Sequence, residues 1–116
     1  MDSIIFKIVT RDQWSEAKTA GVFAGAPIDI ADGFIHFSTS AQVRETAAKH
    51  FGGRDNLLLV HVDASQLGDA LRYEASRGGQ LFPHLYAPMP LKSAIRVEPL
   101  PLDGEGKHVF PAEIGA

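Results

Sequence analysis

One uninterrupted apolar run constrains the fold of this chain more than any other feature. Residues 57–62, Leu-Leu-Leu-Val-His-Val, are the most hydrophobic stretch, and polar turn residues bound them on both sides. The run lacks the apolar–polar alternation of a half-exposed strand, and it is too short for a buried helix. We therefore predict a central strand over 57–62, with the rest of the chain packed around it.

Two helices are predicted from their start signals. A Thr followed three residues later by Gln can satisfy two unpaired amides at a helix start, and this pattern occurs twice. It appears as Thr10 with Gln13 and again as Thr39 with Gln42. Gly21 is placed to end the first helix. The apolar positions facing the core are Trp14 and Ala17 in the first helix and Val43, Ala47 and Phe51 in the second.

Short runs of β-branched and aromatic residues predict further strands. These runs lie at 4–9, 34–37, 71–75 and 94–97, with a terminal edge strand expected at 109–110. The segment 22–32 is expected to be a connector with a short extended piece at 28–30. The tally predicts an α+β domain, with a small mixed, curled sheet and two main helices covering a face.

Length and composition limit the partners. The 116 residues suit a single domain spanning 1–116, which we expect to be a monomer or a weak homo-oligomer. The net charge is -3 and no basic stripe is present, which argues against a nucleic-acid surface and leaves a small molecule as the expected partner. No cysteine, signal peptide or membrane-spanning run is visible, so we expect a cytoplasmic protein that does not bind membranes.

His36 is the first candidate site residue. Strand alternation places it on the face opposite Ile35 and Phe37, and the strand leads directly into Ser38 and Thr39. Backbone amides and hydroxyls at such a junction suit an anion or a ribose diol. The alternative is a buried histidine that packs in the core.

Two later segments carry further candidates. Tyr73 and Glu74 are adjacent in a predicted strand and therefore point to opposite faces; Glu74 is either a general base or a surface residue paired with a nearby arginine. His84 and Tyr86 lie in 77–90, which is expected to be irregular because its three prolines exclude a continuous helix or a central strand. Such a stiff loop either holds site residues or only packs on the core.

A zinc site is the metal alternative. His61 and Asp63 share one strand face, and with His36 and His84 they would supply the three ligands of a catalytic zinc. The spacing is not diagnostic of such a site, so we expect no metal.

Three segments together resemble the bacterial and plant family called domain of unknown function 952. They are Asp32 to Thr39 (DGFIHFST), Tyr73-Glu74, and Phe82 to Tyr86 (FPHLY), and the resemblance covers nearly the whole chain. That family is more remotely similar to the ADP-ribosyltransferase fold, including its tRNA 2′-phosphotransferase branch. The resemblance implies a split, curled sheet and a cleft for NAD-like groups, with NAD as the possible cofactor.

The resemblance also implies roles for these residues. His36 would contact a ribose, Ser38 and Thr39 would hold phosphate or ribose oxygens, and Glu74 would stabilise an oxocarbenium-like charge. Tyr73 would stack on nicotinamide, and His84 or Tyr86 would fill the third position of the site. The expected function is therefore a nucleotide or NAD-like cleft, as an ADP-ribosyl or ribose-phosphate transferase. A non-catalytic binding or interaction domain is the alternative. Either cleft reading predicts that His36 and His84 converge.

Overall fold

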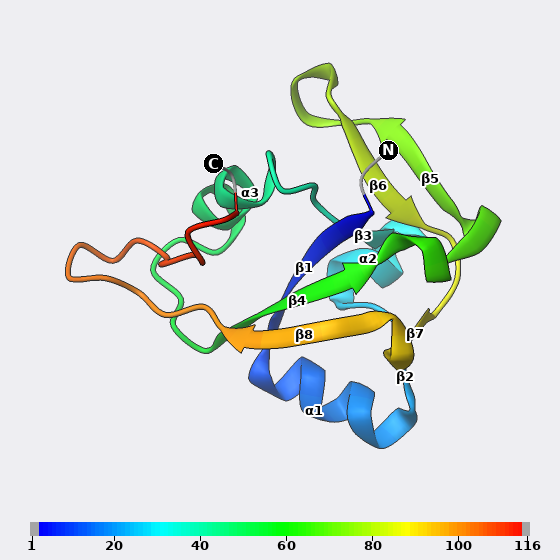
Figure 1. Ribbon diagram of the computed structural model, residues 1–116, viewed down its shortest axis with the longest axis horizontal. Coiled ribbons are helices and arrows are strands. Elements are labelled where there is room, and N and C mark those ends of the chain that lie inside the picture. The colour runs from blue at the N-terminus through cyan, green and yellow to red at the C-terminus, as the bar shows by residue number, and fades with distance from the viewer. Residues whose placement is uncertain (1–2, 115–116) are drawn as a thin grey trace.

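The computed structural model describes residues 3–114 and contains two three-stranded antiparallel sheets (Figure 1). The first sheet has the order β1-β4-β8, with β1 at Ile4–Thr10, β4 at Leu57–Asp63 and β8 at Ala94–Pro99. The second has the order β3-β6-β5, with β3 at Ile35–His36, β6 at Leu81–Leu85 and β5 at Leu71–Ala75. A two-stranded pair joins β2 at Val22–Phe23 to β7 at Met89–Pro90.

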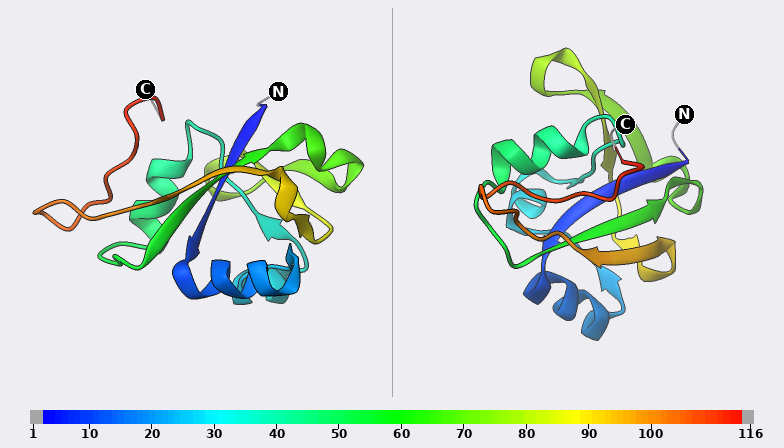
Figure 2. Two further views of the ribbon diagram at one scale, coloured as in Figure 1. Left: turned by 60° about the horizontal axis from the view of Figure 1, so that its bottom comes forward. Right: turned by 60° about the vertical axis from the view of Figure 1, so that its left-hand side comes forward.

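Three helices complete the α+β fold: α1 at Arg11–Ala20, α2 at Pro27–Asp32 and α3 at Val43–His50. Helices α1 and α3 lie on opposite faces of the β1-β4-β8 sheet (Figure 2). The backbone of Phe6 in β1 exchanges hydrogen bonds with that of Ser38, which lies just beyond β3, and this bridge brings the two sheets together. Among the residues described, no helix is long and apolar enough to cross a membrane.

The predicted central strand is confirmed as β4. It pairs with β1 on one side and with β8 on the other, and both of its faces are buried. One face packs Val60 and Val62 against the core that includes Trp14 of α1. The other face packs Leu57 and Leu59 into a second core with α3. The absence of alternation in this run is explained by these two cores.

All the described strand pairs are antiparallel, whereas a sheet with both parallel and antiparallel pairs was expected. The strands near 4–9, 71–75 and 94–97 are confirmed, while the strand expected at 34–37 is only two residues long. Residues 109–110 form no strand; the turn before them is closed instead by an isolated bridge between Leu102 and His108.

The segment 28–30 is helical, so the extended piece expected there was wrong. Pro27 is the first residue of α2, a position where its fixed φ is favourable and its missing N–H costs nothing. The Asp29 carboxylate accepts a hydrogen bond from the Ala26 N–H at 2.7 Å, which satisfies the helix start. Gly33 ends the helix with a φ of 87°, a conformation that glycine adopts without steric cost.

The prediction that the prolines exclude a central strand was also wrong. Strand β6 is the centre of its sheet and contains Pro83. The Pro83 carbonyl accepts a hydrogen bond from Phe37 N–H at 2.9 Å, on the β3 side. The N–H that proline lacks would point to that same side, where β3 has already ended at His36, so the pairing with β5 is undisturbed.

Candidate active site

A groove of about 890 Å³ runs along β1 between α2 and α3. More of its lining surface is apolar than polar, although the polar lining residues outnumber the aromatic and aliphatic ones. This size and composition are typical of small-molecule sites. The polar residues that line it are Lys7, Gln13, Asp32, His36, Ser38, Thr46, His50, Arg54, Ser76 and His84.

His36 lies between two carboxylates. Its Nδ1 is 2.7 Å from Asp29 Oδ1, and its Nε2 is 2.9 Å from Asp32 Oδ2. Asp29 Oδ1 also accepts a hydrogen bond from the His36 backbone N–H at 3.1 Å. Each ring nitrogen of His36 therefore has a carboxylate oxygen as its neighbour, which fixes the orientation of the ring.

Asp29 is fully buried and is the centre of a charge network. Burial alone would raise the pKa of its carboxyl, but the hydrogen bond from His36, the charge of Lys7 and two backbone N–H groups together lower the pKa to about 2. Lys7 Nζ lies 3.0 Å from Asp29 Oδ1. For Lys7 burial outweighs the attraction of Asp29, so its pKa is lowered. Within this pair, the pKa shift of Asp29 favours its charged form, whereas that of Lys7 disfavours its charged form.

His84 is held by Glu74. The two residues come from adjacent strands, β6 and β5, and Nδ1 of His84 is 2.8 Å from Glu74 Oε1. Tyr86 donates its hydroxyl to the same oxygen at 2.6 Å. The hydrogen bonds from Tyr86 and His84 lower the pKa of Glu74, and the one from Tyr86 to Glu74 raises the pKa of Tyr86. Because an ionised Glu74 can only accept, Nδ1 carries the proton, and a neutral His84 has Nε2 as its proton acceptor.

The predicted convergence of His36 and His84 is confirmed. They are paired residues in the register of β3 with β6, and their ring centroids are 5.6 Å apart. Phe34 contacts both rings, stacking on His84 at 4.1 Å and lying 4.6 Å from His36. This short aromatic cluster continues to Tyr86, 5.2 Å from Phe34. The cluster fixes both histidines on one side of the sheet.

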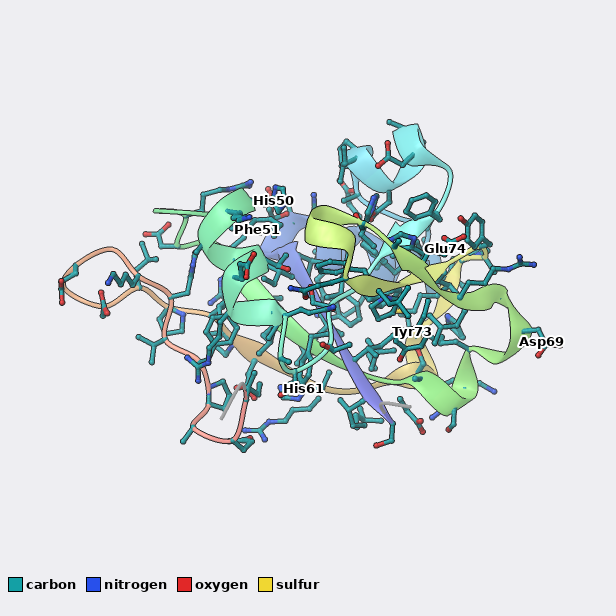
Figure 3. The ribbon with its side chains drawn as sticks, turned by 90° about the horizontal axis from the view of Figure 1, so that it is seen from above. His50, Phe51, His61, Asp69, Tyr73 and Glu74 are labelled. Carbon is teal, nitrogen blue, oxygen red and sulfur yellow. The ribbon has the colours of Figure 1, made fainter. Side chains whose placement is uncertain are left out.

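The other expected site residues are less closely grouped. Glu74 and Tyr86 support His84 but do not line the groove, and Thr39 does not line it either. Tyr73 and Glu74 point to opposite faces of β5, as expected for adjacent strand residues (Figure 3). Because Glu74 contacts His84, Tyr73 lies on the face away from it. A stacking role for Tyr73 in this groove therefore has no geometric support.

Ser38 lines the groove, but its backbone is already used. Its N–H donates to Phe6 O at 2.9 Å, and the Thr39 N–H donates to Gln42 Oε1 at 3.0 Å. The second capping pattern is thus only half formed, and α3 begins at Val43 with Gln42 as its N-cap. Neither amide is available to an anion, contrary to what the strand-to-helix junction suggested.

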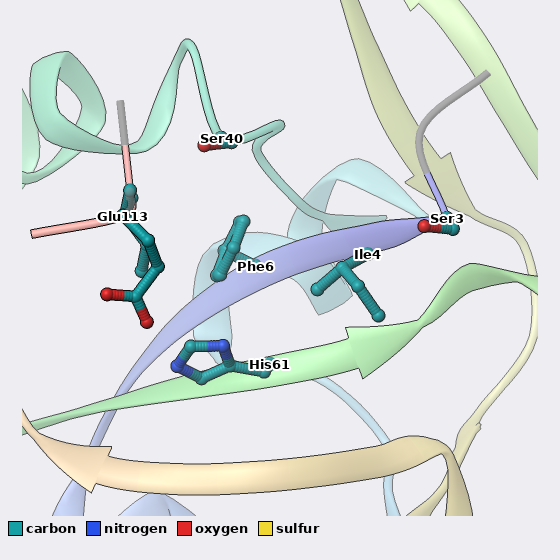
Figure 4. Close-up of a pocket in the computed structure, with 7 residues that line it drawn as sticks. Ser3, Ile4, Phe6, Ser40, His61 and Glu113 are labelled. Carbon is teal, nitrogen blue, oxygen red and sulfur yellow. The ribbon is translucent and has the colours of Figure 1, made fainter. Parts of the chain in front are cut away.

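His61 belongs to a different region. It lines a second cavity of about 470 Å³ on the other side of Phe6, together with Ser40 and Glu113 (Figure 4). Among residues 3–114 no group of three His, Asp or Glu side chains is arranged to hold a metal ion. The zinc alternative that combined His61 with His36 and His84 therefore does not form.

Three groove residues, Lys7, Asp32 and Arg54, were not identified from the sequence, and neither was the buried Asp29 that binds Lys7 and His36. Asp29 and Asp32 lie on a helix that was expected to be a connector, and Lys7 was counted only as part of a strand. A signal did exist for Asp29, since an acidic side chain two residues after a proline is typical of a capped first helical turn. No sequence pattern marked Arg54, because only the folded chain shows that it lines the groove.

Comparison with known families identifies the chain. Residues 8–97 match the family described as "Protein of unknown function (DUF952)". The chain belongs to this DUF952 family. A crystal structure of protein CC0527 from Caulobacter crescentus is 48% identical, with a TM-score of 0.88, over 91% of this chain and 93% of that one. Its solution NMR structure, at the same identity, has a TM-score of 0.82 and covers 91% of both chains. No curated protein matches.

Proposed function

We propose that this DUF952 protein is an enzyme that binds a nucleotide-like small molecule in the groove and uses His84 as a general base. One observation carries the proposal: the buried His84 lines the groove while its Nδ1 is held 2.8 Å from Glu74 Oε1. A carboxylate in that position orients the ring and stabilises the imidazolium that forms when Nε2 takes up a proton. This arrangement is a recurring one for acid–base work.

The part of the groove beside the two histidines also supplies a recognition surface for a sugar. Asp32 lines the groove beside His36, and its side chain is 44% exposed. A carboxylate that accepts hydrogen bonds from vicinal hydroxyls is a frequent means of binding ribose. Pro27, Ile28 and Phe82 provide apolar surface for a base or a nicotinamide ring. A nucleotide has all of these parts within one molecule.

The reaction class that we propose is transfer at a ribose, in line with the resemblance to ADP-ribosyl and ribose-phosphate transferases. With NAD, the bond between nicotinamide and ribose breaks, and its electron pair leaves with nicotinamide. Water attacks the ribose carbon while His84 Nε2 accepts the proton that water loses. The products are nicotinamide, ADP-ribose and one proton. Glu74 acts through His84, because it does not line the groove itself.

The test is turnover by matched histidine variants. Wild-type protein, His84→Gln and His61→Gln are incubated with NAD, ADP and AMP, and released nicotinamide and phosphate are measured by chromatography. Both variants replace a buried histidine by the same side chain, but only His84 lines this groove. We expect turnover to fall by about 100-fold or more in His84→Gln and to change little in His61→Gln. Equal turnover in all three proteins would exclude His84 as the base.

The alternative is a non-catalytic binding protein, and the same samples address it. His84 is only 5% exposed, so a ligand has limited access to its ring. A binding protein would show a raised melting temperature with a nucleotide but no product, because a ligand of the native state stabilises it whether or not chemistry follows. Binding without product in the wild type would replace the enzyme proposal with this alternative.

A further inference from the structure

The end of the groove far from the two histidines has its own chemical character. Arg54 and Gln13 line it, and both carry hydrogen-bond donors. The Arg11 N–H donates to Asn56 O at 3.0 Å, which ties the start of α1 to the loop that carries Arg54. This tie places Gln13, two residues into α1, at the same end as Arg54.

Arg54 is held in place but its charge is not neutralised. The backbone N–H of Arg54 donates to Phe51 O at 3.0 Å, and the backbone carbonyl of Arg54 lies 2.8 Å from His108 Nε2. The guanidinium rests over the Phe51 ring, 5.6 Å from its centroid. Within residues 3–114, no carboxylate lies at ion-pair distance from this guanidinium. An exposed guanidinium whose backbone is held by hydrogen bonds is well suited to bind an anion.

Gln13 has one end fixed by the fold. Its Oε1 accepts a hydrogen bond from Thr10 N–H at 2.9 Å, as part of the capping box at the start of α1. The amide group is thereby oriented, and its Nε2 faces away from the cap with two hydrogens to donate. Among residues 3–114, the only acidic residue that lines the groove is Asp32, which lies beside His36 near the other end of the groove.

The two ends are separated by most of β1. Phe6 is bridged to Ser38, next to the histidines, whereas Thr10 is bonded to Gln13. Four residues of strand correspond to about 13 Å. A ligand that reaches both ends must therefore be elongated, as a nucleoside with its phosphates is.

From these observations we propose that Arg54 and Gln13 form an anion subsite, which holds the phosphate of a ligand whose reacting end lies at His36 and His84. The inference rests on the proposed function of the groove and specifies its substrate as a phosphorylated nucleoside. Backbone amides of Ser38 and Thr39 are engaged within the fold, so the phosphate is held at the Arg54 end instead.

The subsite is tested first with inorganic pyrophosphate, which has no ribose or base. In an NMR titration of the ¹⁵N-labelled full chain, we expect shifts at the Arg54 Nε–H and the Gln13 side-chain amide. Arg54→Gln should bind about 10-fold more weakly or not at all, because it removes a charge-assisted contact. Arg11→Gln is the matched control, since it makes the same change of charge nearby at a residue that does not line the groove. Shifts absent in the wild type, or undiminished in Arg54→Gln, would overturn the subsite.

A second measurement separates this inference from the proposed function. Calorimetric affinities for ADP and adenosine are compared in the same variants, and we expect the preference for ADP to fall about 10-fold in Arg54→Gln only. A wild type that binds both equally would overturn the subsite even if His84→Gln abolishes turnover. Conversely, pyrophosphate binding that depends on Arg54, in a protein that turns over no nucleotide, supports the subsite and refutes the enzyme proposal.

Discussion

The two three-stranded sheets of this molecule place their histidines in contrasting surroundings. On β3-β6-β5, His36 and His84 each have a carboxylate within 2.8 Å of Nδ1, and both rings line the groove. On β1-β4-β8, His61 Nε2 is 3.3 Å from Glu98 Oε2, a longer contact than either of those. Burial, the largest influence on His61, lowers its pKa.

The two regions differ in the charged groups that surround each histidine ring. The buried carboxylate of Asp29 contacts His36, and the positive charge of Lys7 compensates its negative charge. Burying such an ion pair costs free energy unless the two groups are well placed. His61 packs edge-on against Phe6 at 5.0 Å, with Arg96 close to the carboxylate that faces it. A ring held by oriented carboxylates is prepared for proton transfer or ligand binding, whereas His61 is better explained as a packed, neutral side chain.

The largest effect should follow from Asp29→Asn. The substitution removes the negative charge that Lys7 and His36 share, and it leaves Lys7 buried without a counter-charge. We expect a loss of about 3–5 kcal/mol in the free energy of unfolding, measured by urea denaturation. Asp32→Asn removes the other carboxylate of His36 from a largely exposed position. That control should cost less than about 1 kcal/mol, and similar losses in both variants would contradict the assignment of the network to Asp29.

The next effect concerns the support of His84. Glu74→Gln keeps the shape of the side chain but removes the charge that stabilises a protonated His84. Because Glu74 does not line the groove, we expect kcat to fall by about 10-fold or more while KM stays nearly constant. Tyr86→Phe removes only the neighbouring donor to Glu74 and should have a smaller effect on kcat. A rise in KM without a change in kcat would show that Glu74 binds the ligand instead of positioning the base.

Short sequence patterns predicted the elements that depend on residues close together in the sequence. The capping box of Thr10 and Gln13 forms with hydrogen bonds of 2.9 and 3.0 Å, and the apolar run 57–62 is the central strand. The strand character of β6 was missed because proline was judged by its type alone. Its tolerance at Pro83 depends on where β3 ends, which is a property of the assembled sheet.

The site shows the same limit. His36 and His84 could be selected from the sequence, because each stands out in its segment. Their partners could not, since Lys7 and Asp29 are 22 residues apart and meet only after β1 and α2 have packed. The stacking role of Tyr73 came from the family resemblance, although its adjacency to Glu74 in a strand already placed the two side chains on opposite faces.

The smallest effect should be the pH dependence that His61 contributes to stability. Its pKa is lowered in the folded chain, so the unfolded chain binds a proton more readily. The stability that this group supplies is therefore fully present above about pH 6.5, its unfolded value, and is lost as the pH falls through the lower folded value. Arg96 also lowers the pKa of His61, whereas Glu98 and Glu113 raise it. Because the two glutamates oppose the shift, we expect the effect on stability to be small.

The measurement is the free energy of unfolding of wild type and His61→Gln between pH 7.5 and 5. We expect the wild type to lose more stability than the variant over this range, because glutamine does not titrate. Both proteins retain His36, His50, His84 and His108, so the contributions of these residues cancel in the difference. Parallel curves would mean that His61 gains as much from Glu98 and Glu113 as it loses through burial. In that case the contrast with the groove histidines would rest on position and access alone, and no longer on charge.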